Sequence, residues 1–135
     1  MLRGFLRRMV ERDRKRRKKL EEIVKRYDVT AVLFGSRARG DATPASDYDL
    51  LLIYEDSSTL ERLLGDLREA RIPVDVYSFT LEEALEALPY STLILDALTE
   101  GIVLKESLPL KPLTEKLKSL KRRGYRRVEG GWIIR

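Results

Sequence analysis

Apolar side chains recur at helical spacing in two groups near the start of the chain, on either side of a charged run at residues 11–19. Within each group they follow the i, i+3, i+4, i+7 pattern of one helix face. The positions are Leu2, Phe5, Leu6, Met9 and Val10 in the first group, and Leu20, Ile23, Val24 and Tyr27 in the second. The pattern predicts one helix through about Tyr27, whose second half packs on the core. Its first half forms a separate arm or a partner-binding element, or else a solvated, frayed end.

Three apolar runs rich in β-branched residues predict strands in the middle of the chain. These runs are "VTAVLFG" (29–35), "DYDLLLIY" (47–54) and "PVDVYSF" (73–79). A polar loop or short helix follows the first run and extends through Ser46. Between the second and third runs, residues 57–72 predict an amphipathic helix that Ser57 or Ser58 can cap.

Helical and extended patterns continue to alternate after the third strand. Thr80 and Glu83 have the spacing of a capping box at the start of a helix over residues 81–88. A second helical run, 91–101, ends at Gly101, and the apolar residues 102–104 predict a short strand.

The C-terminal segment begins with a turn at Pro109 and Pro112. Residues 113–124 then predict a helix with Gly124 as the residue just beyond its cap. Residues 125–134 predict a hairpin that turns at Gly130 and Gly131. Strands and helices that alternate in this way favour an α/β or α+β layered domain.

The composition limits the chemistry that the chain can perform. Its 135 residues and 15.7 kDa fit one compact domain. Cysteine and histidine are absent, which excludes disulfides, thiolate catalysis, Cys-based zinc sites and the usual general base. Only carboxylates then remain as plausible metal ligands.

Residue usage also indicates where the protein works. No apolar run approaches the ~20 residues that span a bilayer, and the N-terminus lacks the apolar region of a signal peptide, so we expect a cytoplasmic protein. The sequence has no Asn and no Gln, whereas Lys, Arg and Glu are abundant, and this bias predicts a thermophilic host.

The net charge of +5 conceals a strong segregation of charge. Residues 1–26 carry +8, residues 27–110 carry −10 and residues 111–135 carry +7. Basic ends of this kind permit binding to the phosphate backbone of a nucleic acid. Such runs are more often solvated helix faces, and the few aromatic residues near them make base stacking a weak expectation.

Two aspartates stand at the start of the second predicted strand. Side chains alternate across a strand, so Asp47 and Asp49 project from one face about 6.5–7 Å apart, while Tyr48 and Leu50 point the other way. Two anions this close repel each other, and a cation between them removes that penalty. Asp75 lies in the third strand. If that strand lies beside the second, three carboxylates converge as a site for two Mg²⁺ or Mn²⁺ ions requires.

Gly35 and Ser36 end the first predicted strand. A glycine there lets a phosphate approach the backbone N–H groups, Ser36 adds a hydroxyl donor, and Arg37 and Arg39 can neutralise phosphate charge. Each residue also has a purely structural interpretation. Ser36 can cap a helical turn, the two arginines can pair with Asp41 on the surface, and Asp47 can be a turn residue.

The ordered pattern in "GSRARGDATPASDYDLLLIY", followed by "VDVY", resembles the signature of the DNA polymerase β-type nucleotidyltransferase superfamily, specifically its minimal nucleotidyltransferase branch. The resemblance covers about residues 20–106. It implies a polymerase β-like fold, in which helices pack on a small mixed β-sheet. It divides the chain into a basic N-terminal arm (1–19), a nucleotidyltransferase core (20–106) and a basic C-terminal helix and tail (107–135).

The resemblance also implies roles for the residues of the pattern. Gly35 and Ser36 would hold a nucleoside triphosphate, with Arg37 and Arg39 as weaker phosphate contacts. Asp47 and Asp49 would bind the divalent metals, Mg²⁺ or Mn²⁺. Asp75 would complete the metal site and help to deprotonate the acceptor. A hydroxyl of the acceptor would then attack the α-phosphorus and release pyrophosphate.

Minimal members of this superfamily are commonly encoded beside a HEPN-domain ribonuclease toxin. Some neutralise that toxin by transferring AMP from ATP to one of its tyrosines. The resemblance therefore implies an antitoxin that AMPylates a HEPN-domain partner. The alternative is a protein without catalysis that uses its basic ends to bind nucleic acid or to sequester the toxin.

Overall fold

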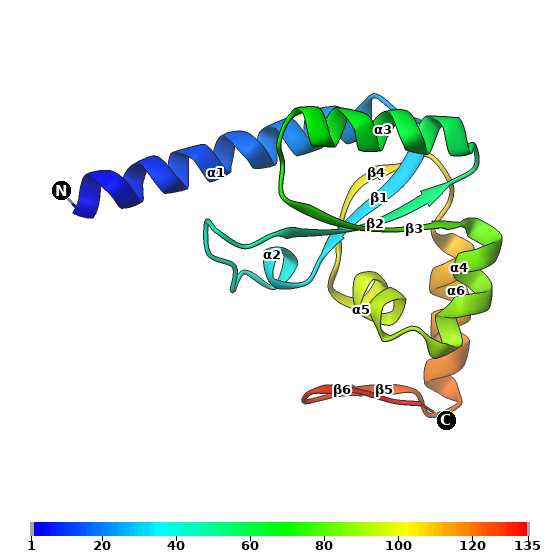
Figure 1. The fold of residues 1–135 in the computed structure, drawn as a ribbon. Coiled ribbons are helices and arrows are strands. Elements are labelled where there is room, and N and C mark those ends of the chain that lie inside the picture. Colours follow the sequence, from blue (N-terminus) through cyan, green and yellow to red (C-terminus); the bar gives the residue numbers. More distant parts are fainter. Residues whose placement is uncertain (1, 135) are drawn as a thin grey trace.

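The computed structural model describes residues 2–134 as one mixed β-sheet with helices on both faces, a helix that extends to one side and a small C-terminal hairpin (Figure 1). In chain order the elements are α1 (Leu2–Lys25), β1 (Val29–Phe34), α2 (Ser36–Arg39), β2 (Tyr48–Tyr54), α3 (Ser57–Glu69), β3 (Val74–Thr80), α4 (Leu81–Ala87), the 3₁₀ turn η1 (Leu88–Tyr90), α5 (Thr92–Glu100), β4 (Ile102–Glu106), α6 (Lys111–Arg122), β5 (Arg126–Val128) and β6 (Gly131–Ile133). The predicted fold class, a small mixed sheet with helices packed on it, is confirmed.

The four long strands lie in the order β3-β2-β1-β4. β1 runs antiparallel to both of its neighbours, whereas β2 and β3 are parallel and are joined by a crossover through α3. A parallel pair needs such a crossover because the chain must return to the same end of the sheet. The β5-β6 hairpin forms a separate two-stranded sheet.

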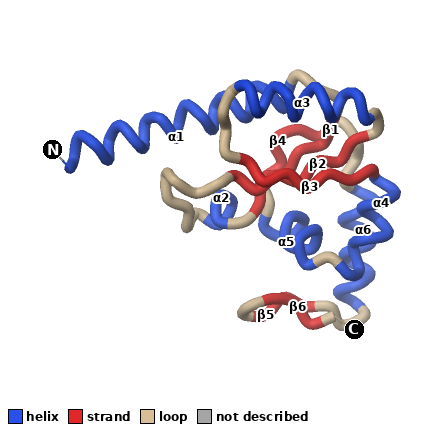
Figure 2. Tube along the Cα trace, viewed as in Figure 1, coloured by secondary structure: helices blue, strands red, loops and turns tan. Residues whose placement is uncertain are grey.

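Each face of the sheet carries its own hydrophobic cluster. Figure 2 shows α1 and α3 on one side of the strands and α4, α5 and α6 on the other. Leu33, Leu50 and Leu52 belong to the cluster beneath α1 and α3, whereas Val32, Leu51 and Ile53 belong to the cluster beneath the other three helices. Both faces of β1 and β2 are therefore covered, which explains why their sequences are apolar runs without alternation.

Local signals in the sequence account for most helix ends. The capping box is confirmed, because the Glu83 N–H donates to Thr80 Oγ1 at 3.1 Å and the Thr80 N–H donates to Glu83 Oε1 at 2.8 Å. At the end of α6, Gly124 has a φ of 112°, and the N–H of the following Tyr125 donates to the Leu120 carbonyl at 3.1 Å. This is the glycine cap predicted at residue 124.

Three predicted details are wrong. α3 is capped by Asp56, not by Ser57 or Ser58, because a carboxylate one residue earlier accepts the Ser58 N–H at 2.9 Å. α6 begins at Lys111 and includes Pro112, since proline is tolerated in the first turn of a helix. The hairpin turns one residue earlier than predicted, since Val128 pairs with Gly131.

The first part of α1, residues 2–12, projects beyond the sheet as an arm (Figure 1). Leu2, Phe5 and Leu6 are 70%, 52% and 51% exposed, whereas Leu20 and Val24 on the same helix are fully buried. The segment is helical and its apolar side chains are exposed, so its role as a partner-binding element stays a prediction. None of the helices that it describes is both long and apolar enough to cross a membrane.

Replacing Gly101 with alanine is expected to lower the free energy of unfolding by about 1–3 kcal/mol, the usual cost of overpacking a core. A Cβ at Gly101 would overlap the Ala97 carbonyl oxygen and Val32 Cγ1, although its φ of −71° and ψ of 159° suit any residue. Urea unfolding measures the effect. Gly65→Ala on α3, where only Arg68 approaches a new Cβ, is the control and should raise the free energy of unfolding by about 0.5–1 kcal/mol. Equal effects at the two positions would contradict the packing argument.

Candidate functional site

Two of the three predicted aspartates are neighbours across the sheet. The parallel register of β2 and β3 pairs Asp49 with Asp75, and the antiparallel register of β1 and β2 pairs Asp49 with Phe34. Residues paired across strands project to the same face. Phe34 belongs to the cluster beneath α4, α5 and α6, so the two carboxyl groups lie on that face, at the end of its core. Tyr48 and Leu50 lie on the opposite face, as the alternation predicts.

The negative charges of Asp47 and Asp75 act on the carboxyl group of Asp49. Burial, followed by the charges of Asp75 and Asp47, raises the pKa of Asp49 above its ordinary value. Arg39 acts in the other direction and is the weakest contribution. A carboxylate whose ionised form is disfavoured by two like charges gains most from a cation placed among them.

The three carboxylates are the type of ligand that a hard divalent cation takes, because Mg²⁺ and Mn²⁺ prefer carboxylate oxygens. Within residues 2–134, no three acidic side chains lie in an arrangement that would already hold such an ion. Asp47 and Asp75 are exposed, whereas Asp49 is half-buried. Two of the three carboxylates are therefore open to solvent, and the third is partly enclosed.

Gly35 lies directly against Asp49. It precedes the short helix α2 and has a φ of 74° and a ψ of −150°, a conformation that is essentially restricted to glycine. A Cβ at this position would lie 3.3 Å from the Asp49 Cγ and nearer still to its Oδ2. Gly35 is also the N-cap of α2, so Ser36 is not the cap that the structural interpretation assigned to it. The glycine thus brings the β1-α2 turn and the carboxylates into contact.

Arg39 lies close enough to the acidic site for its charge to act on Asp49. Its guanidinium pairs with Asp41 at 3.3 Å and with Glu100 of α5 at 3.0 Å. Glu100 also pairs with Arg127 of the C-terminal hairpin at 2.6 Å. The surface pair between Arg39 and Asp41, one of the alternatives from the sequence, is present. Arg39, Glu100 and Arg127 in addition form a network of ion pairs that links α2, α5 and the hairpin. A phosphate contact by Arg39 stays a prediction.

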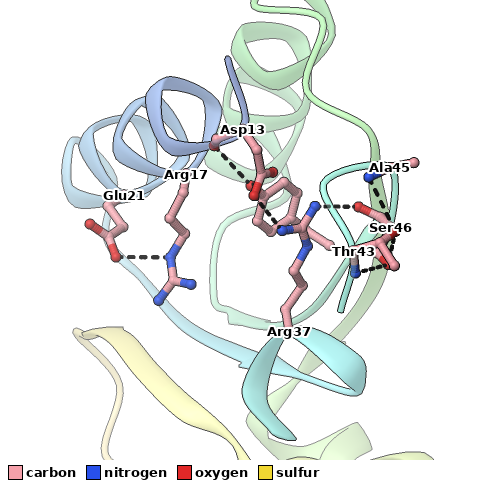
Figure 3. Close-up of polar contacts among 8 residues, drawn as sticks. Asp13, Arg17, Glu21, Arg37, Thr43, Ala45 and Ser46 are labelled. Carbon is pink, nitrogen blue, oxygen red and sulfur yellow. Dashed lines mark hydrogen bonds and ion pairs between the residues drawn. The ribbon is translucent and has the colours of Figure 1, made fainter. Parts of the chain in front are cut away.

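Arg37 has different surroundings from those expected (Figure 3). Its side chain is only 8% exposed, and both terminal nitrogens are engaged, one by Asp13 of α1 and the other by the Ser46 carbonyl. Its guanidinium carbon also lies 4.0 Å above the centre of the Tyr48 ring. The expected surface pair with Asp41 is wrong for Arg37, and these partners favour a role in holding the loop over the predicted contact with phosphate.

Sequence reasoning missed Asp13, although a signal for it was present. Asp13 follows Leu6 and Met9 by seven and four residues and precedes Leu20 by seven, so it lies on the apolar face of its helix. An acid on such a face usually has a buried partner. Glu100, which ends α5, carried no comparable signal.

A hollow of about 580 Å³, lined by Tyr54, Thr80 and Leu108 among others, lies at the opposite end of β2 and β3. The carboxylates instead occupy the end where β2 and β3 begin, beside the β1-α2 turn. The arrangement is an open acidic site with an adjacent glycine turn, which suits a divalent cation and a phosphate-bearing ligand.

Sequence comparison agrees with this geometry. Residues 14–121 match the family described as "Nucleotidyltransferase domain". The match covers most of the chain, so the protein belongs to the nucleotidyltransferase domain family and its general reaction is nucleotidyl transfer. The resemblance to the polymerase β-type superfamily is confirmed at this level. A comparison with curated proteins gave no significant match.

Proposed function

We propose that the protein transfers a nucleoside monophosphate from a nucleoside triphosphate to a hydroxyl group, with Asp47 and Asp49 as ligands of Mg²⁺ or Mn²⁺ and Asp75 completing the site. The observation that supports this most is the register that pairs Asp49 with Asp75, with Gly35 against the same carboxylate. When bound, the cation would supply charge neutralisation at the phosphate that reacts.

Residues of this chain can also accept the proton of the attacking hydroxyl and bind the triphosphate. Asp75 is exposed beside Asp49, so its carboxylate can accept the proton of the attacking hydroxyl. Gly35 leaves room for a phosphate to approach the backbone, and Ser36 follows it with a hydroxyl donor. Arg39, held by Asp41 and Glu100, contributes positive charge for the triphosphate.

We further propose that the donor is ATP and that the acceptor is a tyrosine of a HEPN-domain toxin, which makes this protein an AMPylating antitoxin. The family resemblance suggests this substrate. The arm adds support for a protein partner, because its exposed apolar side chains, Leu2, Phe5 and Leu6, suit a protein surface better than a phosphate backbone. A nucleic-acid partner is the second candidate, supported by the exposed arginines of the same arm, which include Arg3, Arg7 and Arg12.

Incubation with Mg²⁺, each of four labelled nucleoside triphosphates and a cell extract tests the proposal. We expect a labelled band with ATP that protease removes and nuclease does not. The Asp47→Asn/Asp49→Asn double variant should give no band, whereas Glu61→Gln, an exposed acid on α3, should label as the wild type does.

Two other outcomes would contradict parts of the proposal. Unchanged labelling by the double variant would rule out these aspartates as the site. A labelled band that only nuclease removes would replace the protein acceptor with a nucleic acid. Binding to nucleic acid without any transfer, with an affinity that falls steeply with salt, would favour the module without catalysis.

A further inference from the structure

Arg37 and three residues around its buried guanidinium join three separate segments of the chain. Arg37 lies in α2, Asp13 in the middle of α1, and Ser46 and Tyr48 on either side of Asp47. We refer to these four residues as the Arg37 anchor, and Figure 3 shows Asp13, Arg37 and Ser46 pointing toward one another.

The contacts within the anchor are short, and Asp13, Arg37 and Tyr48 form a closed ring to which Ser46 is joined through Arg37. Arg37 Nη1 donates to Asp13 Oδ2 at 2.7 Å, and Arg37 Nη2 donates to the Ser46 carbonyl at 2.6 Å. The Tyr48 hydroxyl donates to Asp13 Oδ1 at 2.6 Å, while its ring lies beneath the guanidinium. Arg37 thus contacts all three other members, Asp13 and Tyr48 each contact two, and Ser46 is held by Arg37 alone.

The anchor shapes the charge states of its members. Burial acts to raise the pKa of Asp13, but the hydrogen bonds from Arg37 and Tyr48, together with the positive charges of Arg37 and Arg16, outweigh it, and the pKa of Asp13 is lowered. Burial and the hydrogen bond to Asp13 raise the pKa of Tyr48 to about 12. At neutral pH the ring therefore consists of a carboxylate, a guanidinium and a neutral phenol, which is the combination that its hydrogen bonds require.

The anchor constrains Asp47 from both sides. The residue before it is held through its carbonyl, and the residue after it through its ring and hydroxyl. Arg37 also lies two residues after Gly35, which contacts Asp49. One guanidinium thus connects the glycine turn to the loop that carries Asp47.

We propose that Arg37 and Asp13 are positioning residues, which hold Asp47 and the Gly35 turn in the relative placement that the divalent cation requires. The inference rests on the proposed function, because it assigns the anchor a purpose at that site. Partners of metal ligands commonly act in this way, by fixing the ligand without contacting the ion.

Removing the charges of Arg37 and Asp13 from water costs free energy, and this cost favours a positioning role over a purely stabilising one. A buried ion pair is often no more stabilising than a well-packed apolar pair of similar size, because both charges must be removed from water. Arg37 Nε is in addition buried without a hydrogen-bond partner in the part of the chain that the structure describes. Apolar side chains could stabilise the fold equally well at this point. The planar guanidinium can in addition donate in fixed directions to a carboxylate and to a backbone carbonyl at the same time.

Titration with Mn²⁺, followed by electron paramagnetic resonance of the free ion, tests the proposal without activity as the readout. Arg37→Lys keeps the charge but loses the planar fork, and Asp13→Leu/Arg37→Met replaces the ion pair with apolar side chains. We expect both to weaken Mn²⁺ binding about tenfold or more. Tyr48→Phe keeps the ring and removes the hydroxyl that donates to Asp13 Oδ1 at 2.6 Å and to the Asp13 carbonyl at 3.3 Å, but it leaves the hydrogen bonds of Arg37 in place. Its effect should therefore be smaller than that of Arg37→Lys.

Glu21→Gln is the matched control. It breaks an ion pair of the same helix, between Arg17 and Glu21 at 3.0 Å, whose hydrogen bond involves none of the four anchor residues. It should bind Mn²⁺ as the wild type does. Circular dichroism at the titration temperature should show the variants folded, and the apolar double variant should have a free energy of unfolding close to that of the wild type.

The outcomes separate this inference from the proposed function. If Asp49→Asn abolishes Mn²⁺ binding but Arg37→Lys and the apolar double variant bind as the wild type does, the positioning role is wrong and the metal site stands. If affinity falls only in proportion to a loss of folded protein, the anchor is structural alone and the inference fails. If the wild type and Asp49→Asn bind Mn²⁺ equally, the proposed site fails and this inference fails with it.

Discussion

Asp49→Asn should reduce nucleotidyl transfer by at least ~10³-fold, which corresponds to about 4 kcal/mol of lost transition-state stabilisation. Asp49 is the member of the acidic group that contacts both parts of the site, since it pairs with Asp75 and lies against Gly35. Asparagine keeps the shape of the side chain but removes the charge that a divalent cation requires. The loss should appear in the rate of the chemical step under saturating nucleotide.

The same substitution should make the protein more stable at neutral pH. The pKa of Asp49 is raised in the folded state, chiefly by burial and then by Asp75 and Asp47, so its ionised form opposes folding. That cost is absent below the pKa of the unfolded chain and is complete above the pKa of the folded protein. The stability advantage of Asp49→Asn should therefore grow as the pH rises from acid to neutral and then level off.

Transfer assays and metal-free urea unfolding across this pH range measure the two effects. Asp28→Asn, an exposed acid between α1 and β1, is the control and should change neither quantity appreciably. A variant that loses activity and is also less stable at neutral pH would show that Asp49 stabilises the fold. It would contradict our view that the ionised Asp49 carboxylate opposes folding and is kept for function.

The parts of the fold that could be predicted from sequence depend on local physics. The capping box of Thr80 and Glu83 and the glycine cap at residue 124 involve residues within a few positions of one another, so spacing alone defines them. The alternation of side chains along β2 likewise placed Tyr48 on the face opposite Asp49. Each of these features follows from backbone geometry that any chain shares.

The parts that could not be predicted depend on contacts between distant segments. Arg37 looked like a phosphate ligand because it follows Gly35 and Ser36, and its burial follows from α1, which brings Asp13 across 24 positions of sequence. Arg39 gained Glu100 as a partner across 61 positions. The register that pairs Asp49 with Asp75 was only a conditional expectation, because no local pattern states which strands are neighbours.

Gly35→Ala is expected to lower the free energy of unfolding by about 3 kcal/mol and the melting temperature by roughly 10 °C. Its φ of 74° and ψ of −150° are disfavoured for alanine, and the new methyl group would overlap the Asp49 carboxylate. Asp49 must then move, and a displacement of about 1 Å at a reacting centre can cost about 10²-fold in rate. Gly40→Ala is the control, because Gly40 also has a positive φ, 83°, but nothing lies within 4 Å of a new Cβ.

A double-mutant cycle with Asp49→Ala separates backbone strain from the collision in Gly35→Ala. Strain acts on Gly35 alone, so it contributes equally whether or not the carboxylate is present. The collision disappears once Asp49 is shortened to alanine, so Gly35→Ala should cost at least about 1 kcal/mol less in the Asp49→Ala background. Additive effects on the free energy of unfolding would mean that the turn and the carboxylate do not touch, and the contact on which the candidate site depends would then be absent.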